Sequence, residues 1–230
     1  MAFFELAENL ARKFRMWGAR KINLAGDRDI EWSWVAAHVP QGPGRALDFG
    51  CGGGALGLLA VQKGFEVTAV DLEEIRWFYW HPKLKFLRED IFSVKRFGAD
   101  CFDLVINCSA VEHVGLAGRY GVMDEEPNGD ILAMQHLRSL MKFGGKMLLT
   151  IPVGRDAVFK PMARVYGEKR LPLLLEGYEI LKEEFWLKDS ANRWVLTEKN
   201  AAVQFKAAMG APNALKNACA LGCFVLQKPQ

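Results

Sequence analysis

The chain has 230 residues, of which 50% are hydrophobic and 25% are charged. This is the composition of an ordinary globular domain, and it excludes a disordered, collagen-like or coiled-coil protein. The formal net charge of +3 is too small to indicate a surface built for nucleic acid.

Residues 1–21 place apolar side chains three and four residues apart among several basic ones, which predicts a basic amphipathic helix. We expect it to pack on the domain or to cover a site, with contact to a membrane surface as the alternative. No apolar run is long enough to cross a bilayer, and Glu5 and Glu8 do not fit a secretory signal. Five cysteines without a CxxC pair fit thiols in a reducing cytoplasm.

Helical and extended segments alternate through the middle of the chain. A short helix is expected around residues 30–38, and Pro40 and Pro43 end it. The sequence then predicts strands at 46–49, 66–70, 84–87, 102–107 and 146–151, with helices at 55–63 and 130–142. Strands separated by helices indicate an α/β fold with a parallel sheet covered on both faces. Extended runs at 178–187 and 222–226 predict a hairpin added at one sheet edge.

A glycine-rich loop, Asp48-Phe49-Gly50-Cys51-Gly52-Gly53-Gly54, follows the first strand. Glycines there allow a tight turn and let a ligand lie against the backbone. The carboxylate of Asp48 disfavours the pyrophosphate of a dinucleotide and favours an ammonium or sulfonium group. Asp71 ends the second strand, at the spacing where a carboxylate accepts hydrogen bonds from ribose hydroxyls.

Asp90 and Ile91, after the third strand, offer a polar edge and an apolar wall for an adenine ring. Each acid taken alone is equally compatible with a helix cap or a turn. Their joint spacing describes a positively charged adenosyl ligand without phosphates, and S-adenosylmethionine is such a ligand.

The sequence resembles the class I S-adenosylmethionine-dependent methyltransferases over roughly residues 45–152. The resemblance rests on the glycine loop, on Val70-Asp71, on Glu89-Asp90-Ile91 and on Phe102-Asp103-Leu104-Val105-Ile106-Asn107-Cys108-Ser109. It implies a Rossmann-like three-layer sandwich whose seven-stranded sheet is mostly parallel, with the last strand antiparallel. It also implies one domain over 1–230, made of an N-terminal extension or lid (1–44), a cofactor-binding core (45–152) and acceptor-side loops with C-terminal strands (153–230).

Carried over position by position, the resemblance implies a set of cofactor contacts. The methionine end falls to Asp48 and the backbone of Gly50, Cys51 and Gly52, the ribose to Asp71 with Leu72, the adenine to Asp90 and Ile91, and the sulfonium side to Asn107, Cys108 and Ser109. Two further segments, 111–121 and 151–173, resemble an uncharacterised family of methyltransferase-like proteins, described as a domain of unknown function.

Glu112 and His113 follow the fourth strand, at the sheet edge where open α/β folds bind ligands. His113 is the candidate general base, with Glu112 orienting it, and a histidine that only stabilises the loop is the alternative. The pair resembles that of quinone-pathway O-methyltransferases, in which an upstream glutamate helps hold a divalent metal. Because Ser109 stands at that position, we expect no metal.

Four further residues are candidates for binding a polar, sugar-like or anionic acceptor: Tyr120, Arg155, Arg164 and Tyr166. The alternative is that the arginines pair with acids and hold a lid in place.

These observations predict a cytoplasmic S-adenosylmethionine-dependent methyltransferase that acts on a small molecule, at oxygen rather than nitrogen. We expect a monomer or homodimer that does not bind nucleic acid. The alternatives are an NAD-dependent oxidoreductase, favoured by the glycine pattern, and a non-catalytic cofactor-binding module. RNA methylation would draw on the basic segments near both ends, but the chain lacks its motifs.

Overall fold

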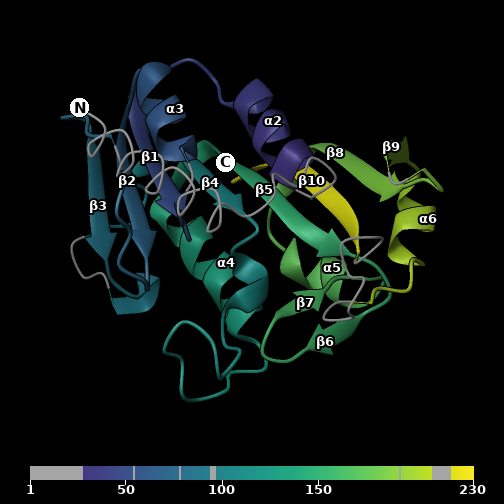
Figure 1. Cartoon of the computed structure of the whole chain (residues 1–230). Coiled ribbons are helices and arrows are strands. Elements are labelled where there is room, and N and C mark those ends of the chain that lie inside the picture. The colour runs from purple at the N-terminus through teal and green to yellow at the C-terminus, as the bar shows by residue number, and fades with distance from the viewer. Residues whose placement is uncertain (1–27, 54, 78, 94–96, 192, 209–218) are drawn as a thin grey trace, which may run out of the picture.

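The computed structural model describes residues 28–53, 55–77, 79–93, 97–191, 193–208 and 219–230 (Figure 1). The helix expected at 1–21 lies outside these residues. The helix expected around 30–38 is present as α2 (Arg28–His38). In the described part of the chain, no helix is both long enough and apolar enough to span a membrane.

Five parallel strands form the half of the sheet that the apolar runs predicted. They are β1 (Gly44–Phe49), β2 (Phe65–Asp71), β3 (Leu84–Arg88), β4 (Phe102–Cys108) and β5 (Met141–Val153). Their order is β3-β2-β1-β4-β5, so the carboxyl ends of β1 to β4 lie side by side at one edge of the sheet. These strands are rich in Val, Leu and Ile because both faces of the sheet are covered.

The C-terminal strands complete the sheet. The last strand, β10 (Ala220–Gln227), runs antiparallel between β5 and β8 (Glu179–Lys188), which confirms the expected antiparallel strand. The expected count of seven strands is wrong, because β9 (Trp194–Thr197) pairs with the outer side of β8 and makes an eighth. Asp189 builds the connecting turn by accepting the N–H groups of Ala191 and Arg193, both at 2.9 Å.

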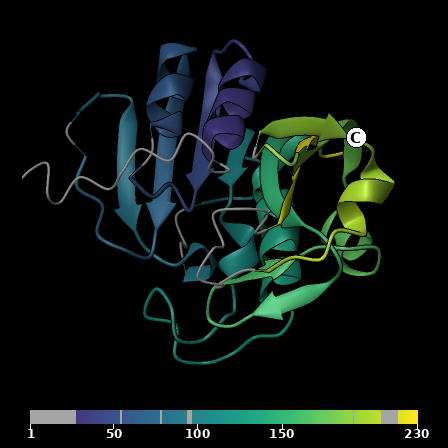
Figure 2. The ribbon, with the colours of Figure 1, turned by 45° about the vertical axis from the view of Figure 1, so that its right-hand side comes forward.

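Helices cover both faces of the sheet, which confirms the three-layer arrangement. On one face, α2 and α3 (Leu56–Gln62) bury Trp34, Val35 and Ala60 against the strands. On the other face lie α4 (Gly129–Leu140), α5 (Arg170–Leu174) and α6 (Lys199–Val203). Figure 2 shows β3 and α6 at opposite ends of the molecule.

Helix α4 ends two residues before the expected residue 142, because Met141 already pairs with Phe102 as the first residue of β5. A short hairpin of β6 (Ala157–Phe159) and β7 (Ala163–Val165) occupies the segment after β5. The turns η1 (Ile91–Ser93) and η2 (Val111–His113) follow β3 and β4 and carry the residues discussed next.

Candidate functional site

The glycine loop leaves β1 in a conformation that requires glycine. Gly50 and Gly52 have φ angles of 63° and 51°, in the left-handed region that favours glycine. The N–H groups of Gly50 and Cys51 donate to the carbonyl of Val70, at 2.9 and 3.2 Å. A Cβ atom on Gly50 would lie only 2.4 Å from the Cβ of Ala110, so the loop is pressed against the segment that follows β4.

Asp71 connects the end of β2 to this loop. Its Oδ2 accepts a hydrogen bond from the N–H of Gly52, and its Oδ1 accepts one from the N–H of Glu73, both at 2.9 Å. A carboxylate oxygen has more than one lone pair, so both oxygens can accept further hydrogen bonds. The carboxylate is therefore fixed in place while it keeps the capacity to bind hydroxyl groups.

A cavity of about 520 Å³ lies over the carboxyl ends of β1 to β4. This volume is within the usual range for small-molecule sites. Its lining includes seven of the predicted cofactor residues, namely Gly50, Gly52, Asp71, Leu72, Asp90, Ile91 and Ser109. Among the described lining residues there are six Asp and Glu and no Lys or Arg, so the cavity favours a positively charged or neutral ligand over an anionic one.

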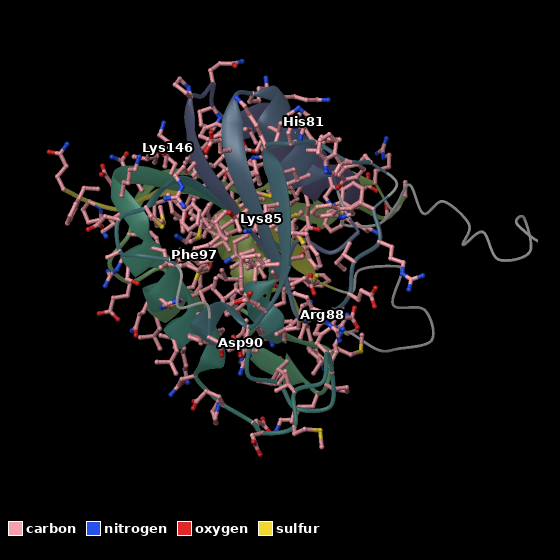
Figure 3. All side chains as sticks on the ribbon, turned by 90° about the vertical axis from the view of Figure 1, so that its left-hand side faces the viewer. His81, Lys85, Arg88, Asp90, Phe97 and Lys146 are labelled. Atoms are coloured by element: carbon pink, nitrogen blue, oxygen red, sulfur yellow. The ribbon has the colours of Figure 1, made fainter. Side chains whose placement is uncertain are left out.

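Asp90 lies just beyond β3. Figure 3 shows Lys85 and Arg88 along the strand and Asp90 past its carboxyl end. The Oδ1 of Asp90 accepts the N–H of Phe92 at 3.0 Å, so this acid also stabilises the turn η1. Asp90 thus combines the turn role and the cavity position that the sequence left open.

The other four predicted cofactor residues, Asp48, Cys51, Asn107 and Cys108, do not line the cavity. The side chain of Asp48 is buried behind the glycine loop, where it accepts the N–H of Gly57. Burial raises the pKa of Asp48 from 3.8 to about 7. Asn107 is fully buried and its Oδ1 accepts the N–H of Val111 at 3.3 Å. The contacts of Asp48 and Asn107 hold the cavity walls from behind.

Trp77 supports the glycine loop from the outside, a role that the sequence did not indicate. Its indole N–H donates to the carbonyl of Gly52 at 3.3 Å. Its ring stacks on Tyr79, with centroids 5.2 Å apart, and meets Phe86 edge-on at 5.5 Å. The aromatic cluster therefore packs against β3 and the loop, within the residues that the structure describes.

His113 lines the cavity at the end of η2. Its Nδ1 is 2.6 Å from the carbonyl oxygen of Met162. Because a carbonyl can only accept, Nδ1 carries the proton and the lone pair of the neutral ring is on Nε2. The Nε2 atom lies 3.7 Å from Oε1 of Glu112, whose side chain is buried. A proton taken up at Nε2 would be stabilised by that carboxylate.

Tyr120 is the one candidate acceptor residue that the structure brings to the cavity. Its ring meets the His113 ring edge-on, with centroids 5.6 Å apart. The guanidinium of Arg119 covers the Tyr120 ring at 4.5 Å and donates to the carbonyl of Met162 at 2.9 Å. His113 and Arg119 thus hold the same carbonyl of the segment after β6.

The structure places the remaining acceptor candidates, Arg155, Arg164 and Tyr166, away from the cavity. Arg155 is exposed and donates from Nε to the carbonyl of Gln204 at 3.0 Å. Arg164, in the middle of β7, and Tyr166, just after this strand, are both fully buried. An anionic acceptor held by these arginines does not fit the structure.

Arg164 fastens the loop that forms the outer cavity wall. It donates to the carbonyls of Val114, Glu126 and Pro127, the last two at 2.9 and 3.3 Å. Its Nε lies 3.6 Å from Asp130, which also accepts a hydrogen bond from Arg170 at 2.8 Å. Val114 and Glu126 both line the cavity, so Arg164 holds its wall. Of the two candidate arginines, Arg164 pairs with an acid, Asp130, whereas Arg155 donates to a carbonyl, so the alternative interpretation fits Arg164 only.

Glu31 is a buried acid that the sequence analysis missed. It extends from α2 to the ends of β4 and β5, where Ser109 Oγ and Thr150 Oγ1 both donate to its Oε1, the latter at 2.9 Å. A signal was present, because Glu31 precedes the buried Trp34 and Val35 by three and four residues and so lies on the apolar face of its helix.

Comparison with known proteins gives matches of three kinds. The profile of the family described as "Caenorhabditis protein of unknown function, DUF268" matches residues 85–210. The Bacillus subtilis protein "Putative methyltransferase YqeM" is 31% identical over 91 residues, which are 36% of each chain. The chain thus matches only about a third of that curated relative.

The similar solved structures have the same fold at low identity. A Burkholderia thailandensis 1,6-didemethyltoxoflavin-N1-methyltransferase gives a TM-score of 0.61 at 15% identity, over 98% of this chain and 86% of its own. An Archaeoglobus fulgidus SAM-dependent methyltransferase gives 0.60 at 17%, over 88% and 95%. The [4+2]-cyclase SpnF gives 0.56 at 17%, over 86% and 80%. The chain belongs to the DUF268 family, and its fold is that of the class I S-adenosylmethionine-dependent methyltransferases.

Proposed function

We propose that this chain is an S-adenosylmethionine-dependent methyltransferase that methylates a small molecule at oxygen, with His113 as general base. The observation that carries the proposal is the Asp71 carboxylate, bound to the N–H of Gly52 at the wall of a cavity whose described lining has no Lys or Arg. That arrangement suits an adenosyl ligand with a positively charged end.

The residues at the cavity fit such a cofactor. Asp71 would accept the ribose hydroxyls, Ile91 would cover one face of the adenine, and the bare backbone at Gly52 leaves space for the methionine end. The bound cofactor supplies a methyl group on a sulfonium, which is an excellent leaving group. The similar Burkholderia structure contains S-adenosylhomocysteine, which supports the assignment.

The protein would then align the acceptor and remove one proton. The Nε2 atom of His113 would take up the proton of an acceptor hydroxyl, and the Glu112 carboxylate 3.7 Å away would stabilise the imidazolium that forms. Tyr120, beside the His113 ring, would fix the acceptor between them. We favour an oxygen acceptor because a neutral hydroxyl must lose its proton during the methyl transfer, and His113 would take up that proton.

The proposal also covers the cellular compartment, the domain organisation and the oligomeric state of the chain. We place the chain in a reducing cytoplasm, since all five cysteines are thiols. We treat residues 1–230 as one domain, a monomer or homodimer, with 1–44 covering the cofactor core 45–152 and 153–230 supplying the acceptor side. Nucleic acid is not expected as a substrate, because the described cavity lining has no basic side chain for a phosphate backbone.

Isothermal titration with S-adenosylmethionine, S-adenosylhomocysteine and NAD tests the cofactor. Binding of the first two without NAD is expected, and tight binding of NAD alone would overturn the proposal in favour of an oxidoreductase. Incubation of cell extracts with methyl-labelled S-adenosylmethionine then tests transfer. Cofactor binding with no labelled product in any extract would favour the non-catalytic module.

A further inference from the structure

We infer that Glu31 strengthens the preference of the cavity for positive charge, by making the hydroxyl of Ser109 a hydrogen-bond acceptor for a positively charged group of the cofactor. The inference rests on the proposed function and adds a residue from α2 to the site. It assigns a role to a buried acid that lies outside the cavity lining.

The position of Ser109 supports this role. Ser109 lies at the end of β4 and lines the cavity, whereas Asp71 and Asp90 lie at the ends of β2 and β3. In the strand order β3-β2-β1-β4, Ser109 is therefore at the opposite end of the cavity from the expected adenine. The charged end of an adenosyl ligand that spans the cavity lies beside it.

The hydrogen bonding fixes the direction of the Ser109 hydroxyl. Its Oγ donates to Oε1 of Glu31, and a serine hydroxyl has only one proton. The Oγ atom of Ser109 therefore has no proton left to donate to a ligand and offers its lone pairs to the cavity. A lone-pair donor polarised by a carboxylate attracts an ammonium or a sulfonium.

Glu31 is held firmly enough to act in this way. Its side chain is 0% exposed, and the Oγ1 of Thr150 donates to the same Oε1 at 2.9 Å. The neighbouring Trp34 on α2 donates its indole N–H to Glu184 on β8 at 2.9 Å, which fastens the helix to the sheet. Burial limits screening by solvent, so a carboxylate at this position acts on Ser109 more strongly than an exposed one would.

Three ligands with different charges separate the possibilities. S-adenosylmethionine has an ammonium and a sulfonium, S-adenosylhomocysteine has the ammonium only, and 5′-methylthioadenosine has neither. In Glu31→Gln, the amide oxygen can still accept from Ser109 but the charge is lost. We expect this variant to bind S-adenosylmethionine roughly tenfold more weakly, the size of a lost interaction with a charged partner, and 5′-methylthioadenosine as the wild type does.

The second ligand identifies the group that is recognised. An equal loss for S-adenosylhomocysteine indicates the ammonium, and no loss indicates the sulfonium. Ser109→Ala should give the same selective loss while the hydrogen bond from Thr150 to the buried carboxylate stays in place, so it serves as the test if Glu31→Gln does not fold. Thr150→Ser is the matched control, because it keeps the hydroxyl that donates to Glu31 and leaves the lining unchanged, and its ligand preference should equal that of the wild type.

Two outcomes overturn the inference but not the proposed function. In the first, Glu31→Gln and Ser109→Ala bind all three ligands with wild-type affinity. In the second, both substitutions weaken the binding of all three ligands equally. The second outcome would mean that both residues only support the fold. A wild-type protein that binds none of the ligands would overturn the proposed function, and this inference with it.

Discussion

The carboxylate of Asp71 and the backbone N–H of Gly52 are joined by a hydrogen bond of 2.9 Å, which fastens the glycine loop to the end of β2. In the proposed function, this one side chain both forms part of the cavity wall and contacts the cofactor. The bond already holds the carboxylate at the cavity, so the ribose binding that we propose would not require the loop to be ordered first.

Asp71→Asn should weaken binding of S-adenosylmethionine by roughly 1 to 3 kcal/mol, because ribose hydroxyls lose a charged partner. Isothermal titration measures the change. Asp103→Asn is the control, since Asp103 binds Lys142 and the N–H of Arg45 at the opposite edge of the sheet. A variant of Asp71 with wild-type affinity would contradict the assignment of this acid to the ribose.

Gly50→Ala should destabilise the loop by at least about 1 to 2 kcal/mol, the cost of a left-handed conformation for a residue with a Cβ. The added atom also meets Ala110 at 2.4 Å, so cofactor affinity should fall with stability. Gly53→Ala is the control in the same loop, because nothing lies within 4 Å of its Cβ position. Urea unfolding measures the stability of both variants, and titration measures their cofactor affinity. Equal stability and equal affinity of the two variants would refute the steric argument.

The half of the sheet made of β1 to β5 was predictable because each strand is an apolar run between helices or turns. Strand β9 was not, since four residues form a strand there only by pairing with β8. The β6–β7 hairpin could not be predicted for the same reason, because each of its strands has only three residues. Such short strands depend on tertiary contacts that periodicity does not record.

The site was predictable where spacing alone sets position, as for Asp71 at the end of β2. It was not predictable where the direction of a side chain matters. Asp48 points away from the cavity toward α3, and Arg164, which was a candidate for binding the acceptor, is buried in β7 and donates to the carbonyl of Glu126 instead. Glu31 could have been found, because an acid on the apolar face of a helix needs a polar partner in the folded protein.

His113→Gln should leave cofactor affinity unchanged and reduce methyl transfer by roughly 10²- to 10⁴-fold, the usual contribution of a general base. The labelled product from extracts supplies the assay. His81→Gln is the control, since His81 precedes β3 and its Nδ1 accepts the N–H of Lys83. Unchanged transfer in His113→Gln would assign the histidine to the loop alone.

Arg164→Lys should lower the free energy of unfolding by a few kcal/mol, because each buried carbonyl left without a hydrogen-bond donor costs about 1 to 3 kcal/mol. Lysine keeps the charge but cannot reach the carbonyls of Glu126 and Pro127 together with Asp130. Urea unfolding measures the change. Arg193→Lys, at an exposed pair with Asp189, should change stability by less than about 1 kcal/mol. Similar effects of the two substitutions would show that Arg164 does not hold the wall.

Asp48 predicts a dependence of stability on pH. Burial raises its pKa from 3.8 to about 7, so between these values the unfolded chain releases a proton that the folded chain keeps. Stability therefore falls as the pH rises from about 4 to about 7 and then levels off. Asp48→Asn removes this contribution, so the free energy of unfolding of the variant should not show this fall. Between about pH 5 and about pH 8, the wild type should therefore lose a few kcal/mol more stability than Asp48→Asn.

Urea unfolding of both proteins at the two pH values measures this difference. Asp103→Asn is the control, because hydrogen bonds from Lys142 and the N–H of Arg45 outweigh its partial burial and lower the pKa of Asp103. Asp103 consequently titrates below the interval and should contribute no change across it. If wild type and Asp48→Asn lose stability in parallel between about pH 5 and about pH 8, then Asp48 is ionised throughout. The acid behind the glycine loop would in that case carry a full negative charge at neutral pH.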